Sequence, residues 1–458
     1  MTFTDISFIF MWLPLMVFAH RLAAFKGLHN YVLCFFSCIL CFWIEPTYAW
    51  LLFLITFINY LTARLVERHH SKGILITWIA ALVFLLGYFK YTNFLFTTIN
   101  QWLNTGLLTK TMIMPLGISF FTFQSIAYVV DVYKGKTKAE TNVLNMLTFF
   151  TFFPSITSGP ILRYEPFRQQ LIERDISNDN IAEGMRRFIT GAFKKVVLAN
   201  QLAIIADYGF GHIDNLGFIL AWGGAVCYMM QIYLDFSGYS DMALGIARML
   251  GFSLPENFNF PYMATSVQDF WRRWHISLSQ WFRDYIYIPL GGNRVSTPRW
   301  IFNILVVWSL TGLWHGASFT FITWGLYFGV LLVLEKYARP YLDKVPTLLR
   351  RIITLLIVMI SWIIFKSADL GSAVAYMKQL VNFRHISNLM ELKLLDILYL
   401  YPVVIIGMIA CTPLFRKALD RLKDRNIYIH DLIMIILLVI TIIMVINSTY
   451  SPFIYFNF

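Results

Sequence analysis

The stretch "FWRRWHISLSQWFRDY" (270–285) brings three arginines, three tryptophans and one histidine into the middle of a mostly apolar chain. Taken as one helix, it aligns an apolar stripe that contains the imidazole, formed by Trp271, His275, Leu278 and Phe282. Two interpretations are open for this stretch alone. It is an interfacial helix with snorkelling arginines, or a helix that delivers His275 to a buried site.

The charged residues of this region can pair along the predicted helix. Asp269 can reach Arg272 or Arg273 one turn later. If the region is functional, we expect it to support the imidazole through Trp274, Asp269, Arg283 and Asp284.

The composition predicts a multi-spanning membrane protein. The chain has 458 residues, of which 58% are hydrophobic and 14% charged, whereas a soluble domain has about 25% charged residues. Apolar runs of spanning length predict an all-α polytopic protein with about 10–13 transmembrane helices. The candidate spans are 5–22, 30–46, 48–65, 73–90, 112–130, 143–160, 187–208, 216–235, 300–318, 319–336, 350–366, 397–413 and 431–447. The first run has no basic residue before it, so we expect a retained helix rather than a cleaved signal peptide.

The basic residues indicate how the chain is oriented. The formal net charge is +12, but the basic residues fall between apolar runs, which favours loops facing anionic lipid over a nucleic-acid surface. The richer loops carry Arg21, Lys26, Arg68, Lys72, Lys134, Lys136 and Lys138. The positive-inside rule then places these loops in the cytoplasm and the N-terminus outside.

The middle third is too polar to cross lipid simply. Polar backbone is tolerated at membrane depth where it is buried in protein or lines a wet cavity. We therefore predict one membrane domain (1–458) with N-terminal spans (1–158), a catalytic core with re-entrant helices (159–335) and C-terminal spans (336–458). We expect the core to form a central funnel ringed by the ordinary spans.

A second histidine lies in "SLTGLWHGASFTFITWGLYFG" (309–329). His315 stands in an apolar span beside Trp314, and an ionisable residue in such a span marks a functional site by default. Burial would keep its imidazole neutral and able to accept a proton. A structural histidine, hydrogen-bonded to another helix, is the alternative.

Other candidate sites are weaker. Three cysteines (Cys34, Cys38, Cys41) share a helix face without a nearby histidine or carboxylate, so we expect small apolar side chains and no metal site. "FSGYS" (236–240) lacks the G-x-S-x-G spacing of a hydrolase elbow. We expect ion pairs with other helices rather than metal binding for Asp235, Asp241 and Arg248.

Together, several motifs resemble the membrane-bound O-acyltransferases, in the bacterial branch of alginate and peptidoglycan O-acetyltransferase membrane subunits. The resemblance is strong over residues 1 to about 335. Its motifs are "FIFMWLPL", "MPLGISFFTFQSIAYVVDVYKG", "FFPSITSGPILRYEPF", "GAFKKVVLAN", "QIYLDFSGYSDMALGIARMLGF", "NFNFPYMATSVQDFWRRWHISLSQWFRDYIYIPLGGNR" and "LTGLWHGASFTFITWGL".

The resemblance implies that His315 is the catalytic histidine and His275 a second functional histidine. It implies a bacterial inner-membrane enzyme that uses acetyl-CoA as donor, without a bound cofactor, and an extracytoplasmic polysaccharide or peptidoglycan acceptor. It also implies a separate periplasmic protein that completes the transfer. Phe328 departs from the branch pattern, in which a third histidine is common, so a third histidine role is not expected here.

From electrostatics alone we expect the phosphates of CoA to be attracted by Arg163, Arg168, Lys194 and Lys195. Two alternatives remain open. One is D-alanyl transfer to teichoic acid, and the other is a transporter without acyl-transfer chemistry, although the paired halves usual in transporters are not evident in the sequence.

Overall fold

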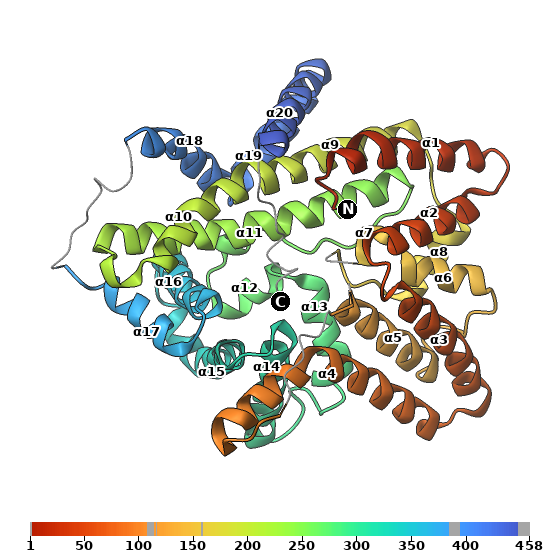
Figure 1. The fold of residues 1–458 in the computed structure, drawn as a ribbon, viewed down its shortest axis with the longest axis horizontal. Helices are drawn as coiled ribbons and strands as arrows, with labels where there is room; N and C mark the ends of the chain where they lie inside the picture. Colours follow the sequence, from red (N-terminus) through yellow and green to blue (C-terminus); the bar gives the residue numbers. More distant parts are fainter. Residues whose placement is uncertain (1, 108–113, 116, 157–158, 384–393, 448–458) are drawn as a thin grey trace. The chain divides into compact units, whose positions relative to one another are not determined.

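The computed structural model describes residues 2–107, 114–115, 117–156, 159–383 and 394–447 (Figure 1). Within these ranges every regular element is helical, which confirms the all-α prediction. Contacts divide the chain into two compact units, residues 1–188 with 243–255 and residues 189–242 with 256–458. Each unit is described by itself.

The first unit contains the N-terminal helices. They are η1 (Phe8–Trp12), α1 (Leu13–Ala24), α2 (His29–Ile44), α3 (Ala49–His69), α4 (Lys72–Leu103), α5 (Ile118–Tyr133), α6 (Val143–Thr151), α7 (Phe153–Ile156) and α8 (Tyr164–Ile172). Two long helices contribute residues to both units, α9 (Asn178–Phe193) and α11 (Phe218–Met249).

The second unit contains the remaining helices. They are η2 (Lys194–Ala199), α10 (Asn200–Gly211), η3 (Ile213–Asn215), η4 (Pro261–Met263), α12 (Val267–Arg273), α13 (Ile276–Phe282), η5 (Arg283–Tyr287), α14 (Thr297–His315), α15 (Phe319–Leu342), α16 (Thr347–Lys366), α17 (Leu370–Gln379), α18 (Leu394–Ala410), α19 (Pro413–Arg425) and α20 (Ile427–Asn447).

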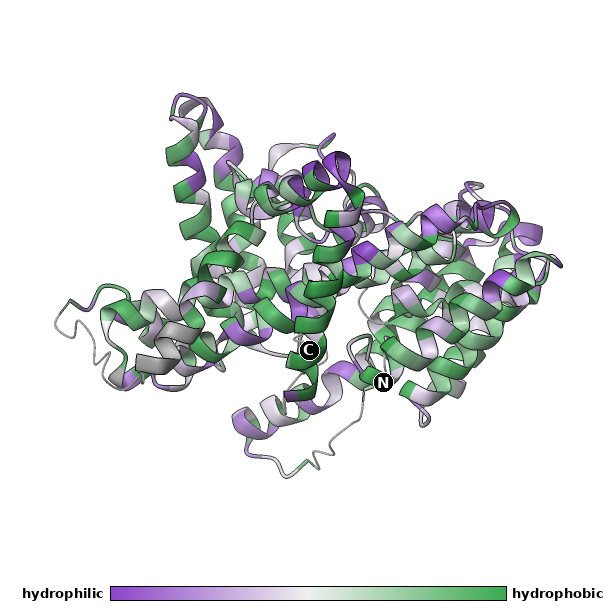
Figure 2. Ribbon diagram, turned by 90° about the horizontal axis from the view of Figure 1, so that it is seen from above, coloured by the Kyte–Doolittle hydropathy of each residue, from purple (hydrophilic) through white to green (hydrophobic). Residues whose placement is uncertain are grey.

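The chain is a multi-pass membrane protein. In the described ranges, seven helices are long and apolar enough to cross a bilayer: α3, α4, Asn178–Gly211, α11, α15, α16 and α20. The pair α18 and α19, bent by 81°, makes an eighth if it counts as one broken or re-entrant span. Shorter apolar helices lie at Phe8–Ala24, α2 and α5. Figure 2 shows hydrophobic residues along the helices and many hydrophilic ones in the connecting loops.

The spans differ in how much of their apolar surface is buried. In α11, 67% of the apolar window is buried inside the protein, against 17% in α20 and 11% in α4. The apolar surfaces of α4 and α20 therefore remain available to lipid. One predicted span was wrong: residues 143–156 form α6 and α7 instead of one continuous helix, with residues 157–158 outside the described ranges. The chain leaves helical geometry at Phe152, just before the Phe153–Pro154 pair, where a proline disfavours a continuing helix.

In the first unit, one buried amide joins three helices. Asn59 on α3 donates to Ser125 Oγ on α5 at 2.7 Å and accepts from Trp78 Nε1 on α4 at 2.7 Å. Its polar atoms are thus satisfied within an apolar setting, as burial requires. Two of the three cysteines of α2, Cys34 and Cys41, are buried, and the Cys41 thiol donates to the Thr151 carbonyl at 3.8 Å, whereas Cys38 is partly exposed.

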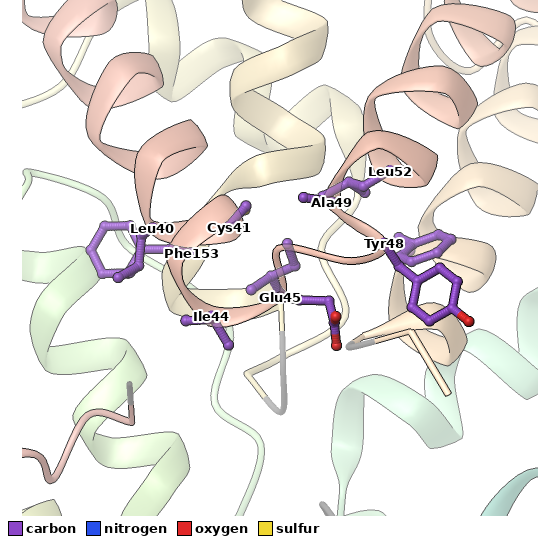
Figure 3. Close-up of a pocket in the computed structure, with 10 residues that line it drawn as sticks. Leu40, Cys41, Ile44, Glu45, Tyr48, Ala49, Leu52 and Phe153 are labelled. Atoms are coloured by element: carbon purple, nitrogen blue, oxygen red, sulfur yellow. The ribbon is translucent and has the colours of Figure 1, made fainter. Parts of the chain in front are cut away.

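A small pocket lies where α2 ends and α3 begins (Figure 3). Its lining is mostly apolar and includes one carboxylate, Glu45. The lining residues are Leu40, Cys41, Ile44, Glu45, Tyr48, Ala49, Leu52, Phe121, Phe153 and Ile156.

In the second unit, α14 and α15 form a hairpin whose backbones touch at glycines. A Cβ added at Gly312 would lie 2.3 Å from the carbonyl oxygen of Phe321. A Cβ added at Gly325 would lie 2.3 Å from the carbonyl oxygen of Trp308. Real Cβ atoms do not approach that closely, so glycine is required for the observed separation of the two helices.

We therefore expect Gly312→Ala to destabilise the protein by about 1–3 kcal/mol, because the added methyl group must push the hairpin apart. Gly223→Ala is the matched control, since a Cβ there would meet no atom within 4 Å and a glycine-to-alanine change in a helix stabilises by up to about 1 kcal/mol. The midpoints of thermal unfolding of the two variants, measured in the same detergent, test this expectation. Equal midpoints for the two variants would contradict the close-packing account.

Candidate active site

His315 is the last residue of α14 and is buried. After it the chain turns through extended Gly316, and Ser318 caps α15 by accepting from the backbone N–H of Thr320 at 3.2 Å. Gly316 is constrained as well, because a Cβ there would lie 2.3 Å from the ring of Phe321. The tight corner fixes the place of His315 at the end of a rigid hairpin.

Aromatic rings surround the imidazole of His315. Its ring centroid lies 4.8 Å from that of Trp314, 4.9 Å from that of Trp324 and 5.3 Å from that of Phe365. These residues come from α14, α15 and α16. Aromatic rings from three helices thus pack against the imidazole of His315.

The stretch 270–285 is not one helix, so the predicted stripe of Trp271, His275, Leu278 and Phe282 was wrong. Helix α12 ends at Arg273, Trp274 is extended, and His275 adopts a left-handed conformation with φ 43° and ψ 56° before α13 begins at Ile276. That region is uncommon for a residue other than glycine, and such conformations persist where surrounding contacts hold them.

Asn257 supplies the contacts that hold this break. Its backbone carbonyl accepts from the N–H of Ile276 at 3.0 Å. Its side-chain Oδ1 accepts from the N–H of Ser277 at 3.2 Å and from the Ser277 hydroxyl at 2.9 Å. A residue eighteen positions before the histidine thus satisfies the first N–H groups of α13, and the corner between the helices aims the imidazole inward.

His275 is 1% exposed, and burial lowers its pKa, so the ring is neutral at physiological pH. Its centroid lies 4.8 Å from that of Phe236 and 5.9 Å from that of Trp314. Because His315 also contacts Trp314, the structure brings both histidines against the same indole ring.

The shared ring belongs to a larger aromatic cluster within the second unit. Its other members are Trp271, Trp274, Trp308, Trp324, Phe328, Trp362 and Phe365. Phe328 is fully buried there, 4.9 Å from Trp271 and 5.4 Å from Trp324 between ring centroids. Phe328 is therefore part of this aromatic cluster, and we expect no histidine role at its position.

The predicted supporting charges lie at the ends of short helices. Asp269 pairs with Arg273 at 2.8 Å, as expected from their spacing, and Arg283 pairs with its neighbour Asp284 at 2.9 Å. Both pairs are at least partly exposed to solvent. Sequence reasoning missed Glu335 on α15, which accepts from the N–H groups of Val267 and Gln268 and so caps α12.

The four predicted phosphate-binding residues divide between the two units. In the first unit, Arg168 pairs with Glu165 at 3.2 Å, and the pKa of that carboxyl is lowered chiefly by hydrogen bonds from Arg168 and then Thr137. Arg163 is half-buried in the same segment. Their role in attracting phosphate stays a prediction.

In the second unit, Lys194 pairs with Asp241 at 2.7 Å, and Lys195 pairs with Asp235 in a buried contact. This confirms the ion pairing predicted for the two aspartates, each with a residue of another helical segment. Both ammonium groups therefore already have a carboxylate partner within the protein. Arg248, the third residue of that prediction, is exposed.

Sequence comparison with known proteins identifies a family for this chain. A family model described as membrane-bound O-acyltransferase matches residues 138–369, which contain both histidines. A probable alginate O-acetylase of Pseudomonas aeruginosa is 39% identical over 81% of this chain and 73% of its own length.

Two further relatives differ in their named activity. A peptidoglycan O-acetyltransferase of Helicobacter pylori is 36% identical over 72% of this chain and 69% of its own length. A teichoic acid D-alanyltransferase of Bacillus subtilis is 33% identical over 50% of this chain and 62% of its own length. The family model and the extended similarity lead to one conclusion: this chain belongs to the membrane-bound O-acyltransferase family.

Proposed function

We propose that this protein is a membrane O-acetyltransferase that takes acetyl groups from cytoplasmic acetyl-CoA. The acceptor is a hydroxyl of an extracytoplasmic polysaccharide or peptidoglycan, or a partner protein that completes the transfer. The observation that carries the proposal is the placement of two buried imidazoles against Trp314. The names of the alginate and peptidoglycan relatives support acetyl as the group and an envelope polymer as the acceptor.

In the proposed reaction, His315 acts as general base. It removes the proton of the acceptor hydroxyl as the oxygen attacks the thioester carbonyl carbon. The tetrahedral intermediate then collapses, the carbon–sulfur bond breaks, and the departing CoA thiolate takes the proton from the imidazolium. His275 assists, either by orienting the acceptor or by stabilising the oxyanion.

The apolar surroundings suit this role. Burial keeps the imidazole of His275 neutral, a form in which one ring nitrogen can accept a hydrogen bond. A site enclosed by indole and phenyl rings also excludes water, which would otherwise hydrolyse the thioester.

The remaining expectations belong to the same proposal. The protein lies in the bacterial inner membrane with its N-terminus outside, and CoA approaches from the cytoplasm. Arg163 and Arg168 attract its phosphates, whereas Lys194 and Lys195, whose charges are balanced by Asp241 and Asp235, contribute little to that attraction. A periplasmic protein receives or delivers the acetyl group, and the reaction needs no bound cofactor.

The proposed function predicts that cells with this protein carry acetyl esters on an envelope glycan and that cells without it do not. Mass analysis of glycans from the two strains measures this directly. A complementing copy of the gene is the control. Alanyl esters in place of acetyl esters would contradict the proposal and favour D-alanyl transfer, the activity named for the Bacillus subtilis relative.

An assay with purified protein distinguishes acyl transfer from transport. We expect acceptor-dependent release of CoA from acetyl-CoA in lipid nanodiscs. Uptake of substrate into vesicles without any release of CoA would contradict acyl transfer and favour a transporter.

A further inference from the structure

The hydrogen bonds around Asn257 determine which nitrogen of His275 carries the proton. A backbone N–H can only donate, so the side-chain atom of Asn257 that faces the N–H of Ser277 must be the oxygen Oδ1. That assignment settles the orientation of the amide. The Ser277 hydroxyl, which donates to the same oxygen at 2.9 Å, agrees with it.

The same oxygen lies 3.2 Å from Nδ1 of His275. A carbonyl oxygen cannot donate, so the hydrogen bond exists only if Nδ1 carries the proton. In a neutral ring the other nitrogen, Nε2, then holds a lone pair and no proton.

Nε2 is fully buried and has no hydrogen-bond partner among the described residues. A buried acceptor without a partner is costly, so this lone pair calls for an explanation, which a bound hydroxyl would supply. The strained backbone of His275, at φ 43°, shows that the fold maintains this ring position at an energetic cost.

We propose that Asn257 is a positioning residue that holds His275 in the Nδ1–H tautomer, so that Nε2 accepts a hydrogen bond from a hydroxyl of the acyl acceptor. This inference rests on the proposed function and narrows it. A neutral His275 of this tautomer presents no N–H at Nε2 and cannot stabilise an oxyanion there. Its role is to hold the acceptor while His315 removes the proton from the reacting hydroxyl.

Nitrogen NMR of the ¹⁵N-histidine-labelled full chain in lipid nanodiscs tests the tautomer without any turnover. The His275 signals, identified by their absence in His275→Gln, should show a protonated Nδ1 and an unprotonated Nε2. Asn257→Leu removes the acceptor oxygen and should release the ring from that tautomer. An Nε2–H tautomer in the unaltered protein, or an unchanged spectrum in Asn257→Leu, would overturn the proposal.

Two further variants test whether Asn257 controls the tautomer of His275 or only stabilises the break between α12 and α13. Ser277→Ala removes one hydrogen bond to the same oxygen but leaves the contact with His275, so it should keep the native tautomer and near-native kinetics. Asn257→Asp retains an acceptor oxygen, so it should keep the Nδ1–H tautomer of His275 and the low KM for the acceptor that Asn257→Leu loses. Equal losses in Ser277→Ala and Asn257→Leu would indicate mere structural support and contradict the proposal.

Kinetics supply the second readout. Loss of one hydrogen bond to the acceptor should raise its KM about five- to tenfold in Asn257→Leu and lower kcat less. A fall in kcat with KM unchanged would point to oxyanion stabilisation instead and overturn the assignment. Should the NMR result hold while no acetyl transfer is found, the proposed function fails and the tautomer assignment stands.

Discussion

His315→Ala should lower acetyl transfer by about 10²–10⁴-fold, the usual contribution of a positioned general base. The imidazole ends α14 inside the aromatic cluster, and alanine leaves no group there that can take the acceptor proton. The protein should still fold and insert, because the hairpin of α14 and α15 is held by its glycine contacts rather than by the imidazole. Transfer of labelled acetyl from acetyl-CoA in isolated membranes measures the loss.

His430→Ala is the matched control for this prediction. His430 is also a buried histidine of the second unit, but it lies on α20 and contacts Asp431 at 3.0 Å. We expect activity close to that of the unaltered protein. Full activity in His315→Ala, with normal amounts of protein in the membrane, would refute the assignment of the base.

Lys195→Met should destabilise the protein strongly. Lys195 and Asp235 form an ion pair in which both side chains are at most 4% exposed. Removing one partner of such a pair leaves a buried, uncompensated charge, which costs about 3–5 kcal/mol. The expected result is a large fall in the midpoint of thermal unfolding, and a smaller yield of folded protein in detergent.

The double variant Lys195→Met with Asp235→Leu is the decisive comparison. It removes both charges and keeps similar volume, and such replacements are often neutral or stabilising. We therefore expect it to recover most of the lost stability. A double variant as unstable as Lys195→Met alone would show that shape, rather than the unpaired charge, causes the loss.

Much of the site could be predicted from local sequence. His315 stood out because an ionisable residue in an apolar run is costly and because small residues flank it. The structure places it against Trp314 and Trp324, at a corner that the glycines of the motif make possible. The ion pairs of Asp235 and Asp241 followed from the same reasoning about buried charge.

The geometry at His275 could not be predicted in this way. The apolar spacing around it fits a continuous helix, and periodicity carries no information about hydrogen bonds from distant residues. Here Asn257 provides those bonds and breaks the helix at the histidine. Glu335 was missed for the same reason, since it caps α12 from a position 67 and 68 residues away. Both polar residues act through tertiary contacts.

The central claim is that His275 and His315 act together in one site beside Trp314. A double-mutant cycle with His275→Gln and His315→Gln tests it most directly, using the rate of acceptor-dependent CoA release by purified protein. Residues that act as a unit are strongly non-additive, so the double variant should be little slower than His315→Gln alone. If the two single losses instead multiply in full, the histidines act independently and the claim is contradicted.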